Sequence, residues 1–250
     1  MEAVDLAVLG LAALLTSALT AVAGLGGGIV LIAVLLLYLE PLVAIPVHAA
    51  IQLASNASRT VIQRRFVDWG VVARFCALLV PGSWLGLQLV EAIPPDLGRA
   101  AIGVFVLLAT WWPRALMLGL HPDRVHPRRR FVPAGAVTGF LGSTFGAAGP
   151  FLGPFFRDLP LPRQGVVGTF AACQSIGHTV KLVLFGLAGF AFVQHAPLLA
   201  VTVVLVVVGT ALGSRLLERL PEAAFRQVYR VVLTLVALRL IGAEVLGQLR

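Results

Sequence analysis

The sequence predicts an all-α integral membrane protein of two inverted-topology repeats, each a re-entrant or bent helical hairpin plus three transmembrane helices. Three observations predict this fold: an apolar composition, a repeated order of apolar segments, and arginines confined to one side of the resulting topology. Of the 250 residues, 59% are hydrophobic and 12% are charged. Because a soluble domain has about 25% charged residues, we expect most of the apolar side chains to face lipid.

Apolar blocks define the predicted helices, because about 20 mostly apolar residues are needed to cross a bilayer. In chain order the blocks are Val4–Ala23, Ile29–Leu39, Val43–Ile62, Gly70–Val90, Leu97–Leu118, Phe131–Phe145, Pro150–Phe156, Gly165–Gly186, Phe192–Leu217 and Ala224–Leu246. The blocks Ile29–Leu39 and Pro150–Phe156 are too short to span a bilayer, so each is predicted to be the returning arm of a hairpin.

An Arg-rich link separates two segments with the same order of block lengths. We therefore divide the chain into a first transmembrane repeat (1–120), a basic cytoplasmic link (121–130) and a second transmembrane repeat (131–250). A shift of 122 residues pairs Thr16 with Thr138, Leu19 with Leu141, Gly24 with Gly146, Gly27 with Gly149, Gln52 with Gln174 and Arg59 with Lys181. A shift of 127 pairs Gly82 with Gly209, Gly86 with Gly213, Pro94 with Pro221 and Arg99 with Arg226. These ordered matches predict an internal duplication.

The arginines predict how the halves are oriented, because cytoplasmic loops carry an excess of Lys and Arg. If each half opens with a hairpin, the second half is inverted and most arginines fall on one side. They are Arg64, Arg65, Arg114, Arg124, Arg128, Arg129, Arg130, Arg157, Arg163, Arg215, Arg219, Arg226 and Arg230. Parallel halves would move several of these clusters outside. Inversion is therefore predicted, with both termini non-cytoplasmic.

Other classes of function are less well supported by the residues. The net charge of +8 comes with no interleaved aromatic residues, so no nucleic acid is predicted as a partner. His48, His178 and His195 have neither ligand spacing nor carboxylate or thiolate companions, and no metal or other cofactor is expected. The sequence around Ser143 misses the G-x-S-x-G pattern of hydrolases, so no catalytic residue is assigned.

Two glycine-rich breaks, Gly24–Gly28 and Gly146–Pro150, interrupt apolar runs at matching places. Irregular backbone at membrane depth requires a cavity that satisfies its polar groups, and a helix that begins at each break directs free N–H groups toward that cavity. An anion site is predicted there, as in inverted-repeat transporters. Its predicted residues are Gly24, Gly27, Gly28, Gly146, Gly149 and Pro150. The alternative that the small residues only allow close helix packing stays open.

The third block of each half carries a polar face. His48, Gln52, Asn56 and Arg59 are spaced four, four and three residues apart, which places them on one helical face. The second half has Gln174, His178 and Lys181. Polar residues inside spans usually face a cavity or another helix, and all of these except His48 are predicted to bind an anion. His48 and His178 are the candidates for proton coupling. Snorkelling of the two cations and interhelical bonding by the two glutamines remain alternatives.

The glycine breaks and the Gln/His/cation faces resemble the sulfite exporter TauE/SafE-like family of membrane permeases, and the resemblance covers essentially the whole chain. It implies transport of sulfite, an organosulfonate or a related small anion across the bacterial inner membrane, with proton coupling and a homodimer left open. It also implies that the breaks and the two polar faces line the pathway, and that membrane lipid surrounds the protein. The alternative is a membrane-embedded enzyme or assembly factor that acts on an anionic lipid or headgroup.

Overall fold

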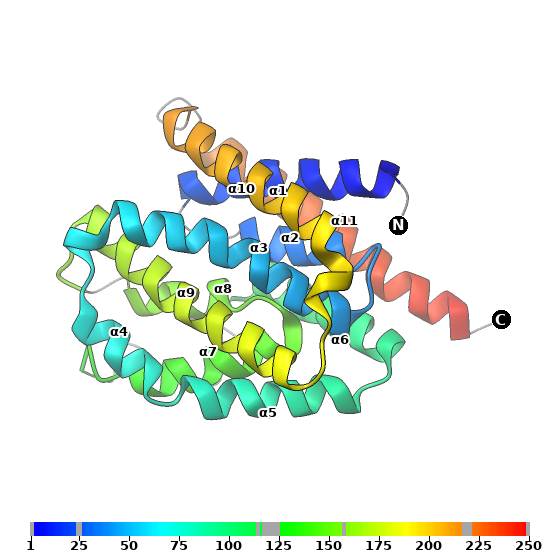
Figure 1. Cartoon of the computed structure of the whole chain (residues 1–250), viewed down its shortest axis with the longest axis horizontal. Coiled ribbons are helices and arrows are strands. Elements are labelled where there is room, and N and C mark those ends of the chain that lie inside the picture. The colour runs from blue at the N-terminus through cyan, green and yellow to red at the C-terminus, as the bar shows by residue number, and fades with distance from the viewer. Residues whose placement is uncertain are drawn as a thin grey trace.

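The computed structural model describes residues 3–23, 27–113, 116, 126–156, 159–216 and 222–248. Every regular element in these ranges is a helix, which confirms the all-α prediction. The longer elements run along the length of the molecule in Figure 1. They are α1 (Ala3–Ala23), α2 (Gly27–Leu35), α3 (Pro41–Ile62), η1 (Arg64–Phe66), α4 (Trp69–Cys76), α5 (Leu79–Ala92), α6 (Pro95–Trp111), α7 (Phe131–Phe145), α8 (Gly149–Leu152), η4 (Gly153–Phe156), α9 (Arg163–Leu187), η5 (Phe192–His195), α10 (Ala196–Leu216) and α11 (Glu222–Gln248).

Three predicted blocks are not single α-helices. Pro150–Phe156 is divided between α8 and the 3-10 helix η4, and Phe192–Leu217 begins with η5 before α10. The block Gly70–Val90 is divided between α4 and α5, which meet at an angle of 45°. Pro81 explains the break, because proline removes one helical hydrogen bond and its ring clashes with the carbonyl four residues earlier. Pro81 therefore lies in the first turn of α5, where the missing N–H costs nothing.

Two described helices, Arg163–Leu187 and Phe192–Gly213 (the latter counted with η5), are long and apolar enough to cross a membrane by length and composition. The bent pair of α4 and α5 makes a third if it is one span, and Val4–Thr20 and Phe131–Phe145 are shorter apolar helices. Six full spans were predicted, whereas two described helices, or three with the bent pair, meet the criterion of length and composition. In α3, polar side chains interrupt the apolar sequence; such residues usually face a protein cavity rather than lipid.

The two short arms pack inside the bundle. The nine residues of α2 measure about 14 Å, roughly half of a hydrocarbon core. A Cβ at Gly27 would collide with the Thr16 carbonyl and the Thr20 hydroxyl, so α2 lies directly against α1. Gly146, which ends α7, has a φ of +84°, and a Cβ there would lie 2.5 Å from Cγ1 of Ile32 on α2. The second break therefore abuts the first arm.

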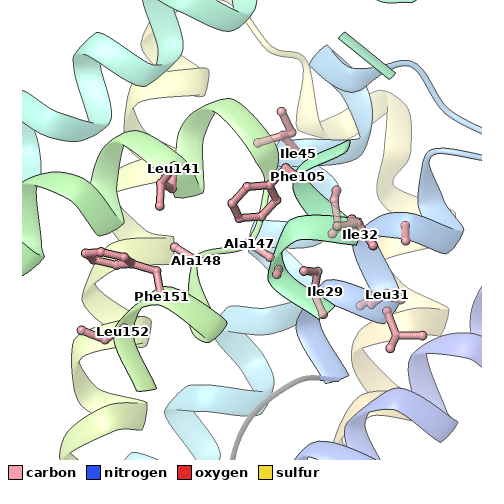
Figure 2. Packing of buried hydrophobic residues seen from close by; sticks show 14 of the residues in the cluster. Ile29, Leu31, Ile32, Ile45, Phe105, Leu141, Ala147, Ala148, Phe151 and Leu152 are labelled. Carbon is pink, nitrogen blue, oxygen red and sulfur yellow. The ribbon is translucent and has the colours of Figure 1, made fainter. Parts of the chain in front are cut away.

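Apolar side chains fill the space around this junction. Figure 2 shows Ile29 and Ile32 of α2 beside Phe105 of α6 and Ala147 of the second break. All four side chains are buried. This packing holds α2 and the second break in the middle of the bundle rather than at its surface.

Helices of one half pack mainly against helices of the other. The principal pairs are α1 with α10, α7 with α4 and α5, α3 with α9, and α6 with α11. Glycines allow the closest approaches, because a Cβ at Gly82 or Gly86 of α5 would collide with a backbone carbonyl of α7. Gly209 and Gly213 of α10 lie in the same way against carbonyls of α1. The bundle therefore depends on small residues for its helix contacts, as membrane bundles commonly do.

Candidate functional site

The site lies where α3 and α9 cross. Gly168 near the start of α9 lies against Gln63 after the end of α3, whereas the rings of His48 and His178 meet 5.8 Å apart. Residue numbers therefore rise along one helix as they fall along the other, so the two helices run antiparallel. Their polar faces, predicted separately, point at each other.

A first cavity of about 30 Å³ lies between α3, α9, the start of α2 and the second glycine break. Since one water needs on the order of 10–15 Å³ of such space, the cavity has room for about two waters. Its lining residues are Thr20, Gly28, Ile29, His48, Gln52, Asn56, Arg59, Ala147, Gly149, Pro150, Phe170, Gln174 and His178. Most of the predicted site residues therefore meet in one place.

A second cavity of about 20 Å³ lies on the other side of Gln174 and His178, which line both cavities. Its other lining residues are Leu79, Ser83, Thr138, Gly139, Gly146, Ala148, Gly177 and Lys181. The two predicted cations thus lie in different cavities: Arg59 lines the first and Lys181 the second.

Arg59 is only 6% exposed, so it does not snorkel to an interface in this structure. Its Nη2 donates to Oδ1 of Asn56 over 2.8 Å, and its Nε donates more weakly to the Ser55 carbonyl at 3.4 Å. Asn56 in turn donates from Nδ2 to the carbonyl of Gln52. Nη1 of Arg59 has no partner among the described residues. The helix therefore holds the guanidinium in place and leaves one donor nitrogen for a ligand.

Lys181 is also buried, and its Nζ donates to the carbonyl of Gly146 over 2.8 Å. Gly146 has a φ of +84°, and its carbonyl accepts this hydrogen bond from α9. Among the described residues that line either cavity there is no Asp or Glu. Both cations therefore lack a carboxylate counter-ion in the described site.

His48 connects α3 to the first arm. Its Nε2 lies 2.8 Å from the carbonyl of Gly28. Since a carbonyl only accepts, Nε2 carries the proton in this contact. The Nδ1 atoms of His48 and His178 are buried and have no partner in the described part of the chain.

One described residue of the predicted site, Gly27, lines neither cavity and packs against α1. Gly24, which was also predicted, lies outside the described residues. The structure adds residues that the sequence reasoning missed, chiefly Phe170 and Thr138. The repeat contained a signal for Phe170, because the shift of 122 relates it to His48. It contained none for Thr138, because the equivalent Thr16 lines neither cavity.

The donor set of the site suits an anion rather than a metal. The described residues contain no group of three His, Cys, Asp or Glu side chains that could hold a metal ion. The cavities instead offer guanidinium, ammonium, amide and hydroxyl groups, which donate hydrogen bonds to negative charge.

Comparison with known proteins identifies the family of the chain. The family model described as sulfite exporter TauE/SafE matches residues 9–240. Searches of curated proteins and of solved structures find no match to the chain. The matched range includes every described residue that lines the two cavities. With its buried cationic site among apolar helices, the chain belongs to the sulfite exporter TauE/SafE family of membrane transport proteins.

Proposed function

We propose that this protein is a secondary transporter that moves a small sulfur oxyanion or sulfonate across the inner membrane. One observation carries the proposal: Arg59 and Lys181 are buried beside two adjoining cavities whose described lining contains no carboxylate. A buried charge is costly unless it is paired. An anionic substrate would supply the missing charge, and the amides of Gln52 and Gln174 would orient it.

The architecture that we propose is a pair of inverted repeats, residues 1–120 and 131–250, joined by the cytoplasmic link 121–130. The helix contacts support it. Gly82 lies against the backbone carbonyl of Ala136, and Gly209 lies against the backbone carbonyl of Leu14. The two contacts are equivalent in the repeat: a shift of 127 relates Gly82 to Gly209, and a shift of 122 relates Leu14 to Ala136. The same two shifts relate the contact of Gly86 with Phe140 to the contact of Gly213 with Ala18.

The antiparallel crossing of α3 and α9 also supports inversion, because equivalent helices of inverted repeats run in opposite directions. Figure 1 shows the start of α1 and the end of α11 at one end of the bundle, and the junction of α3 with α4 at the other. That junction, η1, carries Arg64 and Arg65. We therefore place η1 in the cytoplasm and both termini outside it. Rocking of one half against the other would expose the site to each side in turn.

The proposal is tested by flux of labelled sulfite and taurine into proteoliposomes. Arg59→Gln and Lys181→Met each remove one cation, and Arg74→Gln removes an exposed cation that lines neither cavity. We expect saturable wild-type flux of one anion, a loss of about tenfold or more in the first two variants, and no change in the third. A charge-assisted hydrogen bond contributes about 1.5–3 kcal/mol, which corresponds to that loss. Absence of flux for both anions, or equal flux in all variants, would refute the proposal.

Proton coupling through His48 and His178 is the finer part of the proposal. Both rings line the first cavity, and each has an unpartnered Nδ1 that could take up a proton. A pH gradient should then drive accumulation of the substrate in wild type. His48→Gln, at the one coupling candidate that is not predicted to bind the anion, should retain exchange of labelled substrate but lose accumulation. Accumulation by His48→Gln at the wild-type level would exclude this histidine from coupling.

A further inference from the structure

We infer that the pathway contains two anion sub-sites in series, an Arg59 sub-site in the first cavity and a Lys181 sub-site in the second. This inference rests on the proposed function and changes how the two cations are used. Instead of holding one anion together, each cation would bind an anionic group in its own cavity. The Lys181 sub-site takes one anionic oxygen or a single halide ion.

The partition between the cavities is made of side chains. Gln174 and His178 line both cavities, whereas Arg59 and Lys181 each line only one. Lys181 is tied to Gly146 on the far side of this partition, and Arg59 is tied to its own helix at Asn56. An anion that passes from one cation to the other must therefore pass these two side chains.

The second cavity contains an unused hydroxyl. Thr138 is 4% exposed, and its Oγ1 has no partner among the described residues. Other buried threonines of the bundle, such as Thr110 and Thr202, donate to the carbonyl four residues earlier. Thr16, which corresponds to Thr138 in the first repeat, donates to Ala12 over 2.7 Å. Since buried polar atoms are rarely unpartnered, the Thr138 hydroxyl is available to a ligand.

The ammonium group of Lys181 points to the same ligand. It has three N–H donors, and its one hydrogen bond within the described chain goes to Gly146. Ser83, which is 1% exposed, adds a hydroxyl to the lining, and Gln174 adds an amide. Water alone would leave the positive charge uncompensated, so these donors favour an anion. The volume of about 20 Å³ suits a group of one or two heavy atoms rather than a whole sulfonate.

The test is calorimetric titration of the full-length protein in detergent, without chloride, using sulfite under anaerobic conditions and, separately, bromide. Wild type should bind bromide at two sites, one in each cavity. Lys181→Met should retain the Arg59 site, and Arg59→Gln should retain the Lys181 site. Thr138→Val, which preserves side-chain shape, should weaken one site about tenfold, because it removes a hydrogen bond to a charged ligand. The matched control Thr16→Val should bind as wild type, since Thr16 lines neither cavity.

Three results would overturn the inference: a single wild-type site, loss of all binding in both cation variants, or a Thr138→Val variant that binds like wild type. Size-exclusion profiles identify variants that do not fold, and Thr138→Val tests the sub-site even if a cation variant fails. If sulfite competes with bromide for the site that Thr138→Val weakens, the natural occupant of that site is an oxygen of the substrate. If sulfite and bromide bind independently of each other, the occupant is a halide. Two binding sites without flux in proteoliposomes would refute the transport proposal and leave the sub-sites intact.

Discussion

Replacement of Gly86 by alanine tests the contact between α5 and α7. In open helix, Gly→Ala stabilises by about 1 kcal/mol. At Gly86 the added Cβ would collide with the Phe140 carbonyl and lie 3.0 Å from both Ser143 Cβ and Thr144 Oγ1. Overpacking of this kind costs about 1–3 kcal/mol. Disturbing the bond from Thr144 to the Gly86 carbonyl costs about 1 kcal/mol more. We expect net destabilisation of about 1–3 kcal/mol.

The assay is unfolding of the purified protein in detergent, followed by helical circular dichroism. Gly242→Ala is the matched control, because a Cβ at this helical position would meet no other described part of the chain within 4 Å. Gly213→Ala should behave like Gly86→Ala, since its Cβ would meet the Ala18 carbonyl on α1. The reasoning is refuted if Gly86→Ala is as stable as Gly242→Ala. A stable Gly213→Ala beside an unstable Gly86→Ala would contradict the equivalence of the two halves.

Two further predictions concern the second break and the α4 cap. Gly146→Ala combines a positive φ with a Cβ 2.5 Å from Ile32, so it should lower stability more than Gly86→Ala in the same assay. In a chain that already carries Ile32→Ala, the same Gly146→Ala substitution should cost less, because the steric part of its cost is removed and the part due to φ remains. Asp68→Asn keeps the capping contact to α4 but loses the 2.8 Å ion pair with half-exposed Arg128. It should therefore cost at most about 1 kcal/mol, and stability measured at low and high salt should show the difference shrinking as salt is raised.

Much of the fold and of the candidate site was predictable from residue types and spacing. The apolar blocks predicted where the helices lie, and α7 matches its block Phe131–Phe145, but α6 ends at Trp111, well before the predicted Leu118. The spacing of His48, Gln52 and Arg59 placed them on one face, because a helix has 3.6 residues per turn. The division of Gly70–Val90 was missed, although Pro81 was the signal for it.

The placement of the glycines could not be read from the repeat. Gly27 and Gly149 occupy matched positions, yet Gly27 packs against α1 and Gly149 lines the first cavity. A glycine that allows close packing and one that borders a cavity have the same sequence signature. Only the neighbouring helix decides between these roles.

The sequence by itself determined the class of the protein, its family and the chemical nature of its donor groups. These depend on composition, on short-range periodicity and on order along the chain. The tertiary structure alone decided that Arg59 and Lys181 line separate cavities, with Gln174 and His178 between them. The reason is geometric: periodicity sets the direction of a side chain around its own helix. The depth at which two helices cross depends on contacts between segments far apart in the chain, such as Gly168 against Gln63.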